Sequence, residues 1–338
     1  MMSYLRQIIK SLLVRSDDLI ARNYIRFIND RPGLIVLLFH NLFTDAQEAA
    51  RMGSYPHESI TLAQFRELIE YFLEQGFQFI SDRDILSGLD AGRHYLLITF
   101  DDGYYANYRA LPVIQEYEVP ALFFISAGHV SDQRAFWWEV LYRERKRQNI
   151  SNDVIAEECS SLVGLHHRAI ERYQLECFGS KALEPKSDLE RPFRPEELRA
   201  FAAERYVFIG NHTRDHAYLP AYSTADGVSQ ITTAQTLIEM MTGIRPTSIA
   251  YPSGRVDARV HGMAQAAGMQ LGFGSEANKN RPLSMIPGQA LLGLGRYAAQ
   301  GDRSLRQQCD AFRSDFQLAT EIRRLRKAWG WNRQPSII

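Results

Sequence analysis

Short apolar runs alternate with longer segments of helical periodicity, and this alternation restricts the fold more than any other feature. Strands are expected at 34–39, 77–80, 95–98, 120–125, 206–210, 248–252 and 270–274. Helices are expected between them, at 62–76, from Ser81, and at 105–117, 226–242 and 257–267. Strands that alternate with helices form parallel βαβ units. The pattern therefore predicts an α/β fold, and a barrel with its site at the carboxyl ends of the strands fits it.

Two clusters of polar side chains follow these runs where a strand ends. Asp101 and Asp102 come soon after run 95–98, and His212 and His216 follow run 206–210. A buried aspartate without a partner is costly, so these carboxylates need a reason to be there. Adjacent side chains on an extended segment point to opposite sides, so the two aspartates can serve different purposes. Two imidazoles and one carboxylate make a candidate divalent-metal site with open coordination positions.

The composition excludes several classes of protein. The 338 residues are 45% hydrophobic and carry 39 basic and 39 acidic side chains, which permits one large domain or two smaller ones. A formal net charge of zero disfavours a nucleic-acid-binding surface, so no nucleic-acid partner is expected. Cys159, Cys177 and Cys309 lie far apart and predict reduced structural thiols, with a Cys159–Cys177 pair as the alternative.

The first residues do not resemble a secretory signal, because Lys10 and Arg15 interrupt the apolar run. Apolar residues from Leu5 to Leu13 have helical spacing, which predicts an N-terminal helical segment over 1–30. Two interpretations stay open for it: packing on the domain, or peripheral contact with a membrane. We therefore expect a cytoplasmic protein, with attachment at the inner face of the membrane as the alternative.

A charged segment at 131–205 interrupts the rhythm of strands and helices. It is expected to be a mostly helical insertion in a barrel domain that spans 31–300, and a helical extension is expected at 301–338. Trp137 and Trp138 in the insertion are expected either to stack on a sugar or to form the insertion's core.

Three segments resemble the motifs of the NodB-homology polysaccharide deacetylases. Thr99–Gly103 reads T-F-D-D-G, His212–His216 fits H-[S/T]-x-x-H, and Ile249–Gly254 is similar to the third motif, F-A-Y-P-[YF]-G. The three follow the family's order within 34–300. The resemblance implies a distorted, incomplete (β/α) barrel of about seven parallel strands. It also implies metal-dependent removal of N-acetyl or O-acetyl groups from sugars.

The resemblance assigns a role to each residue of the first two motifs. Asp102, His212 and His216 are the implied metal ligands, and zinc is the implied metal, with other divalent ions left open by the ligand types. Asp101 is the implied general base, which takes a proton from the attacking water. The alternative for Asp101 is a structural cap on the following turn.

The third motif departs from the family pattern. An arginine that positions the base is absent, because Ala250 stands in its place, and Arg296 is predicted to supply that contact instead. Tyr251 and Ser253 are expected to line the substrate carbonyl. The backbone N–H of Ser253 is the implied donor to the oxyanion, a role that does not depend on the side chain.

The general acid also departs from the common pattern. The late L-x-H motif is missing, because 290–296 reads A-L-L-G-L-G-R. Residues 36–40 read V-L-L-F-H, which is similar to the N-terminal V-L-x-Y-H of the poly-N-acetylglucosamine deacetylases. His40 is therefore the predicted acid that protonates the leaving amine, with His57 as the alternative.

These observations predict hydrolysis of an N-acetyl, or related N-acyl, group on an amino sugar. The expected partner is a surface glycan or its lipid-linked precursor. Two alternatives remain: an amidohydrolase acting on a non-sugar amide, and a carbohydrate-binding relative without catalysis. The complete set of Asp101, Asp102, His212 and His216 disfavours the last, because a binding protein needs no base beside a metal site.

Overall fold

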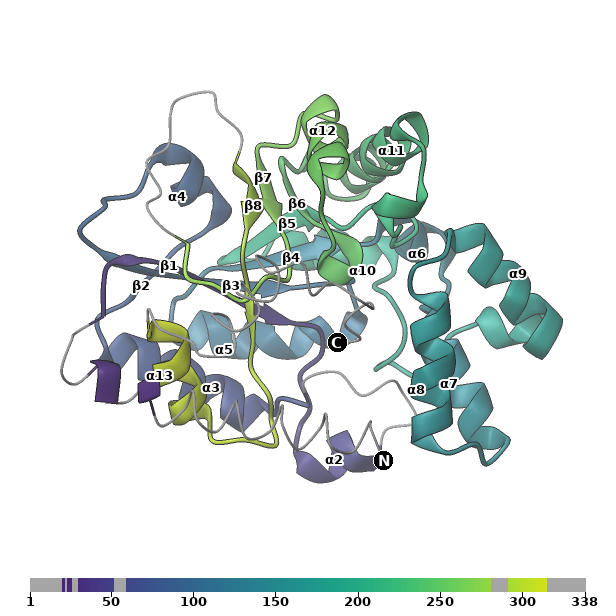
Figure 1. The fold of residues 1–338 in the computed structure, drawn as a ribbon, viewed down its shortest axis with the longest axis horizontal. Coiled ribbons are helices and arrows are strands. Elements are labelled where there is room, and N and C mark those ends of the chain that lie inside the picture. The colour runs from purple at the N-terminus through teal and green to yellow at the C-terminus, as the bar shows by residue number, and fades with distance from the viewer. Residues whose placement is uncertain (1–19, 22, 26–29, 52–58, 281–290, 315–338) are drawn as a thin grey trace, which may run out of the picture.

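A computed structural model describes residues 20–21, 23–25, 30–51, 59–280 and 291–314 (Figure 1). Most of the predicted N-terminal helical segment, the alternative acid His57 and the end of the C-terminal extension lie outside these residues. All three cysteines are free thiols, as expected. No helix in the described ranges has the length and apolar character that crossing a membrane requires.

One parallel sheet forms the centre of the described structure. Its strands are β1 (Gly33–Phe39), β2 (Gln78–Phe79), β3 (His94–Phe100), β4 (Ala121–Ile125), β5 (Val207–Asn211), β6 (Ser248–Ala250), β7 (Leu271–Phe273), β8 (Leu291–Leu294) and β9 (Tyr297–Ala298). The order is β8-β7-β6-β5-β4-β3-β1-β9, with β2 paired to β3, and every pair is parallel. Because β2 and β9 have only two residues each, seven longer strands remain, and the predicted α/β barrel is confirmed.

Two apolar layers face the two sides of the sheet, and side chains alternate between them along each strand. In β1, Leu34 and Val36 join an inner cluster, whereas Ile35, Leu37 and Phe39 join the larger outer cluster under the helices. Strand side chains have a period of two, so a continuous apolar run with both faces covered is typical of a buried parallel strand. This is why run 34–39 has no polar position.

Helices pack on the outer face of the sheet. They are α2 (Ala46–Arg51), α3 (Leu62–Glu74), α5 (Leu111–Glu116), α6 (Ala127–Asp132), α11 (Thr224–Thr242), α12 (Ala258–Ala266) and α13 (Leu305–Arg313). Helix α4 (Asp82–Ser87) instead places Ile85 in the inner cluster. As predicted from the sequence, α3 begins after Thr61, whose Oγ1 accepts a hydrogen bond from the Gln64 N–H at 3.2 Å. The Gln64 side chain accepts the Thr61 N–H in return at 2.9 Å, which completes a capping box.

Two residues, Gly295 and Arg296, join β8 to β9, although these strands stand at opposite ends of the sheet order. So short a link requires the two edges to lie close together, so the sheet is rolled into a nearly closed barrel. Asn280 bridges the remaining gap: its Nδ2 donates to the Leu34 carbonyl at 3.3 Å, and its Oδ1 accepts the Gly295 N–H at 2.8 Å. The roll therefore carries Arg296 to the edge of the barrel beside the first strands.

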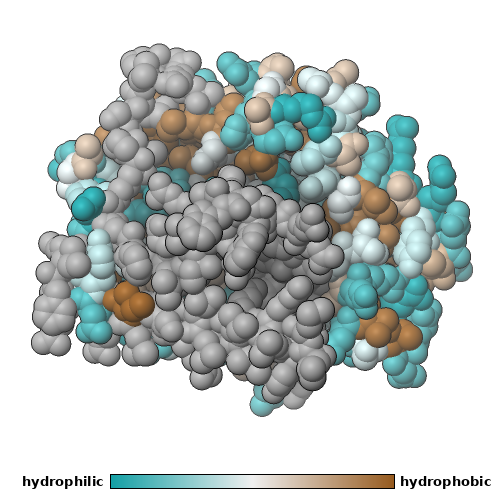
Figure 2. All heavy atoms as spheres, in the orientation of Figure 1, coloured by the Kyte–Doolittle hydropathy of each residue, from teal (hydrophilic) through white to brown (hydrophobic). Residues whose placement is uncertain are grey.

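The insertion is mostly helical, as expected, and lies beside the sheet (Figure 1). It contains α7 (Trp137–Arg147), α8 (Asn152–Leu162), α9 (His167–Phe178) and α10 (Pro195–Ala202). Its visible surface mixes hydrophilic side chains with small hydrophobic patches (Figure 2). The returning chain pairs with the loop after β3, because the Tyr105 N–H donates to the Arg191 carbonyl at 3.0 Å and the Phe193 N–H donates to the Gly103 carbonyl at 3.2 Å.

The described start of the C-terminal extension packs on the barrel. Leu305, Cys309 and Phe312 of α13 belong to the same apolar cluster as the buried face of α3. Arg313 donates through Nε to the buried carboxylate of Asp30 at 2.9 Å. This contact ties the residues before β1 to the residues after β9.

Candidate metal centre

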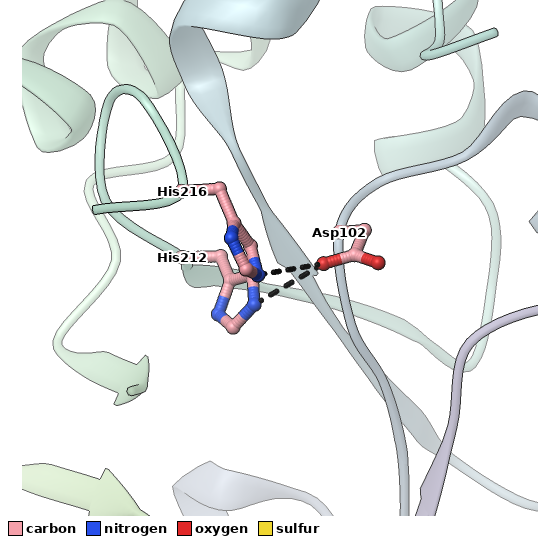
Figure 3. Close-up of side chains that lie close together, drawn as sticks. All are labelled: Asp102, His212 and His216. Atoms are coloured by element: carbon pink, nitrogen blue, oxygen red, sulfur yellow. Dashed lines mark ion pairs between the residues drawn. The ribbon is translucent and has the colours of Figure 1, made fainter. Parts of the chain in front are cut away.

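Asp102, His212 and His216 lie together at the carboxyl ends of β3 and β5 (Figure 3). Oδ1 of Asp102 is 3.3 Å from Nε2 of His212 and 3.4 Å from Nε2 of His216. One ligand atom from each residue lies within 4.8 Å of the others. Because carboxyl ends of parallel strands meet at one edge, residues more than 100 positions apart in the sequence converge there.

The turns that carry these residues contain strained backbone. Asp102, Thr213 and His216 all have a positive φ, at 75°, 63° and 47°. This region is rare for non-glycine residues, above all for a β-branched one such as Thr213. Hydrogen bonds from backbone N–H groups to side chains stabilise the strained turn. Asn211 Oδ1 accepts the Thr213 N–H at 2.7 Å, and Thr213 Oγ1 accepts the Ala217 N–H at 2.8 Å. Strained non-glycine residues cluster at functional sites, and three of them gather here.

Glycine is required after Asp102 for reasons of both space and conformation. Gly103 has a φ of 84°, and a Cβ added there would lie 3.1 Å from Cδ1 of Ile125 on β4. Gly103 also donates its N–H to the Asp101 carbonyl at 3.0 Å. The last residue of the first motif thus lets the Asp102 turn pack closely against the end of the next strand.

The orientation of His212 is set by the third motif. Its Nδ1 lies 2.8 Å from the Ala250 carbonyl oxygen. Because a carbonyl oxygen only accepts, Nδ1 carries the proton, and Nε2 of a neutral ring presents its lone pair toward Asp102. A hydrogen bond to a fixed carbonyl is a common way of orienting a metal-ligating histidine.

The donor set fits a divalent cation. Both carboxylate oxygens of Asp102 are buried, and neither accepts a hydrogen bond from any residue in the described ranges. The net pKa of this carboxyl is lowered well below its ordinary value despite burial, which favours the ionised form that a metal needs. Burial lowers the pKa of His216 to about 3, which favours the neutral ring that a metal needs. An ionised, buried carboxylate that accepts no hydrogen bond from the described residues and faces two imidazole nitrogens suits zinc, and iron(II), cobalt or nickel as well.

Asp101 points to a different partner. Its two carboxylate oxygens accept hydrogen bonds from Arg296, Nη1 to Oδ1 at 2.7 Å and Nη2 to Oδ2 at 2.8 Å. Burial raises the pKa of Asp101, but the charges of Arg296 and His212 and the hydrogen bonds from Arg296 together outweigh burial, so the net pKa is lowered. Arg296 is itself held by the Gly274 carbonyl, which accepts from Nε at 2.9 Å. The sequence-predicted contact between Arg296 and Asp101 is therefore present.

His40 lies in the loop after β1, at the same edge of the barrel. Asn107 donates through Nδ2 to the His40 carbonyl at 2.6 Å, which ties this loop to the segment that follows the first motif. Burial and Arg296 affect the pKa of Asp101 most, and the His40 charge lowers it further. The His40 charge also lowers the pKa of Asp102, and the His40 side chain is partly exposed.

The Tyr251 side chain packs outside the inner apolar cluster of the barrel. Its hydroxyl donates to the Leu292 carbonyl at 3.0 Å, and its ring packs among residues of α12. Side chains alternate along β6, so Ala250 faces the barrel interior and Tyr251 faces outward. Ser253 is exposed with a φ of 60°, and its N–H donates no hydrogen bond to another residue of the described ranges.

Sequence analysis missed a buried network beside His216. Trp138 donates through Nε1 to the Tyr104 hydroxyl at 2.8 Å, and that hydroxyl donates to Oε1 of Glu139 at 2.9 Å. Trp138 is 6% exposed and so belongs to a core, whereas Trp137 is half-buried. The one sequence feature that pointed to this network was Tyr104, which directly follows the first motif.

Solved structures with a similar fold include deacetylases, although their sequences have diverged far. PplD, a deacetylase from Streptococcus pyogenes in complex with acetate, superposes with a TM-score of 0.57 at 14% identity, over 83% of this chain and 99% of that one. IcaB from Ammonifex degensii superposes with a TM-score of 0.56 at 18% sequence identity, over 84% of this chain and 98% of that one. A de-N-acetylase from Aggregatibacter actinomycetemcomitans superposes with a TM-score of 0.53 at 15% sequence identity, over 82% of this chain and 99% of that one. At such identities the likeness shows the fold alone.

Comparison with the curated proteins finds no match. The polysaccharide deacetylase family model matches residues 89–272, more than half of the chain. The matched range contains Asp101, Asp102, His212 and His216. This match supports carbohydrate deacetylation as the type of activity. The chain belongs to the polysaccharide deacetylase family.

Proposed function

We propose that this protein is a metal-dependent hydrolase that removes an N-acetyl, or related N-acyl, group from an amino sugar. The observation that carries the proposal is the buried carboxylate of Asp102, which has no hydrogen-bond partner in the described ranges and faces two imidazole nitrogens. Asp101 lies beside it, held by Arg296, as a second carboxylate free of that cluster. The proposed substrate is a surface glycan or its lipid-linked precursor.

Asp102, His212 and His216 would hold the metal, with zinc proposed first. When bound, a divalent ion lowers the pKa of water and polarises a carbonyl oxygen. Asp101 accepts the proton of the attacking water, because its lowered pKa keeps it ionised at neutral pH. Arg296 occupies one side of each Asp101 oxygen and leaves other lone pairs to accept that proton.

The water oxygen adds to the acyl carbon as Asp101 takes its proton, and the carbonyl oxygen gains charge. The C–N bond then breaks, and the leaving nitrogen takes a proton from His40. The unpaired Ser253 N–H is the proposed donor to the oxygen that gains charge, a contribution of about 3–4 kcal/mol in comparable sites. Products are the free carboxylic acid and the sugar amine. The backbone of Ser253 carries this role, so the unusual side chain at that position does not matter.

Acetate release tests the proposal. The purified protein is incubated with N-acetylglucosamine oligomers, with O-acetylated sugars and with small non-sugar amides, before and after a chelator and again after Zn²⁺ is restored. We expect acetate from the N-acetylated oligomers, loss with chelator and recovery with metal. Release from the small amides alone would favour the non-sugar amidohydrolase, and binding of oligomers without any release would favour a carbohydrate-binding protein.

Replacing the proposed acid is expected to slow turnover without removing the metal. His40→Ala should lower kcat about 10²-fold or more, because the leaving amine loses its proton donor. The rate of the wild-type protein should fall at high pH as His40 loses its proton, and this fall should weaken in the variant. The measurement is the pH–rate profile for acetate release, with metal content determined on the same sample.

His261→Ala is the matched control for His40→Ala, because His261 lies on α12, where its ring contacts Tyr251 rather than the aspartates. An unchanged pH–rate profile in His40→Ala would pass the role of acid to another group.

A further inference from the structure

The insertion contacts the candidate metal centre through Trp138 of α7. The centroid of its indole lies 4.5 Å from that of the His216 imidazole, and the ring planes meet at 62°. Phe136 stacks on the same indole at 4.9 Å and 19°. Edge contacts between aromatic rings have a preferred geometry, so a fixed indole restricts the orientation of the imidazole beside it.

His216 needs such a restraint more than His212 does. His212 is oriented by its contact with the Ala250 carbonyl, whereas the ring of His216 makes no hydrogen bond with any residue that the structure describes. A ligating histidine usually donates its second ring N–H to a fixed acceptor, which sets the direction of the metal-binding nitrogen. For His216, packing against Trp138 takes the place of that hydrogen bond.

Trp138 is itself fixed by two fully buried side chains. Its indole N–H donates to the Tyr104 hydroxyl, which in turn donates to Glu139. Tyr104 and Glu139 are each 0% exposed. Buried polar groups without partners are costly, so these hydrogen bonds hold the indole in one orientation. Tyr104 stands two residues after Asp102, so the network joins the insertion to the loop that carries the carboxylate ligand.

We propose that Trp138 is a positioning residue for the metal centre: it holds the imidazole of His216, and Tyr104 and Glu139 hold Trp138. The proposal rests on the proposed function, since it concerns the same metal site. It assigns the insertion a part in building the centre. Removal of the indole should therefore weaken metal binding even where the fold is intact.

Binding of Co²⁺ tests this role without reference to activity. Affinity is measured by equilibrium dialysis, and ligand geometry by the visible absorption spectrum of the Co²⁺ protein. Trp138→Leu is expected to lower the affinity about 10–100-fold, the usual effect of losing an outer-shell partner, and to change the spectrum. Trp138→Phe should recover most of the affinity, because a phenyl ring preserves the edge contact. Trp137→Leu is the matched control on the same helix.

Tyr104→Phe keeps every ring but removes both hydrogen bonds, so it should weaken Co²⁺ binding less than Trp138→Leu does. Thermal unfolding of the metal-free proteins identifies any variant that fails to fold, and Trp138→Phe and Tyr104→Phe then carry the test. Wild-type affinity and spectrum in the folded Trp138 variants, or an equal loss in Trp137→Leu, would overturn the proposal. If the wild-type protein binds no Co²⁺, or His212→Ala binds it equally well, the metal centre itself is refuted, which is a distinguishable result.

Discussion

His212→Ala is expected to lose both its metal and its hydrolytic activity while keeping its fold. The substitution leaves only Asp102 and His216 of the three ligands. Two protein ligands are too few to retain a divalent ion. The Ala250 carbonyl loses its hydrogen-bond donor, but it belongs to a strand whose ladder with β7 remains. Metal content by elemental analysis, acetate release and circular dichroism are measured on one preparation.

A second histidine substitution controls for the loss of an imidazole as such. His261→Ala removes a ring that packs near Tyr251, outside the cluster of Asp102, His212 and His216. It should keep both metal and activity. Full metal occupancy in folded His212→Ala would show that this histidine is not a ligand, whatever its activity.

The second large effect is expected for Asp101→Asn, which should retain the metal and lose most of its turnover. Asparagine preserves the shape of the side chain but cannot accept the proton of the attacking water. The loss should therefore equal the contribution of a general base, about 10²–10⁴-fold in kcat. Acetate release at saturating substrate measures it, and elemental analysis shows that the metal is still present.

Arg296→Lys separates the base from its support. Lysine keeps the positive charge but loses the two parallel hydrogen bonds to Asp101. Its turnover should fall between that of the wild-type protein and that of Asp101→Asn. The double variant should be no slower than Asp101→Asn alone, because residues that act as one unit are not additive. Turnover near the wild-type value in Asp101→Asn would mean that another group is the base.

Much of the fold was predictable because its signals are local. A buried parallel strand is apolar on both faces, so runs such as 34–39 and 120–125 could be recognised without knowledge of their neighbours. Helix starts at Thr61 and Ser81 follow from side chains that cap the backbone three residues further on. Such interactions depend on residues close together in the sequence.

The cluster of Asp102, His212 and His216 was also predictable, although its members come from distant segments. Parallel strands place their carboxyl ends at one edge, so Asp102, His212 and His216 were expected to meet once each was assigned to a strand end. The contact between Arg296 and Asp101 followed from the same rule. By contrast, the direction of Tyr251 depended on where β6 ends, because a shift of one residue moves a strand side chain to the opposite face.

The sequence by itself determined the order of strands and helices as far as β7, the strand-end position of Asp101, Asp102, His212 and His216, and the chemistry that these residues support. Only the tertiary structure decided that β8 and β9 close the barrel around Arg296, that Tyr251 packs outward, and that Trp138 lies against His216. Strand periodicity and motif spacing express interactions between near neighbours in the sequence. Barrel closure and the packing of the insertion depend on contacts between residues far apart, which no local pattern encodes.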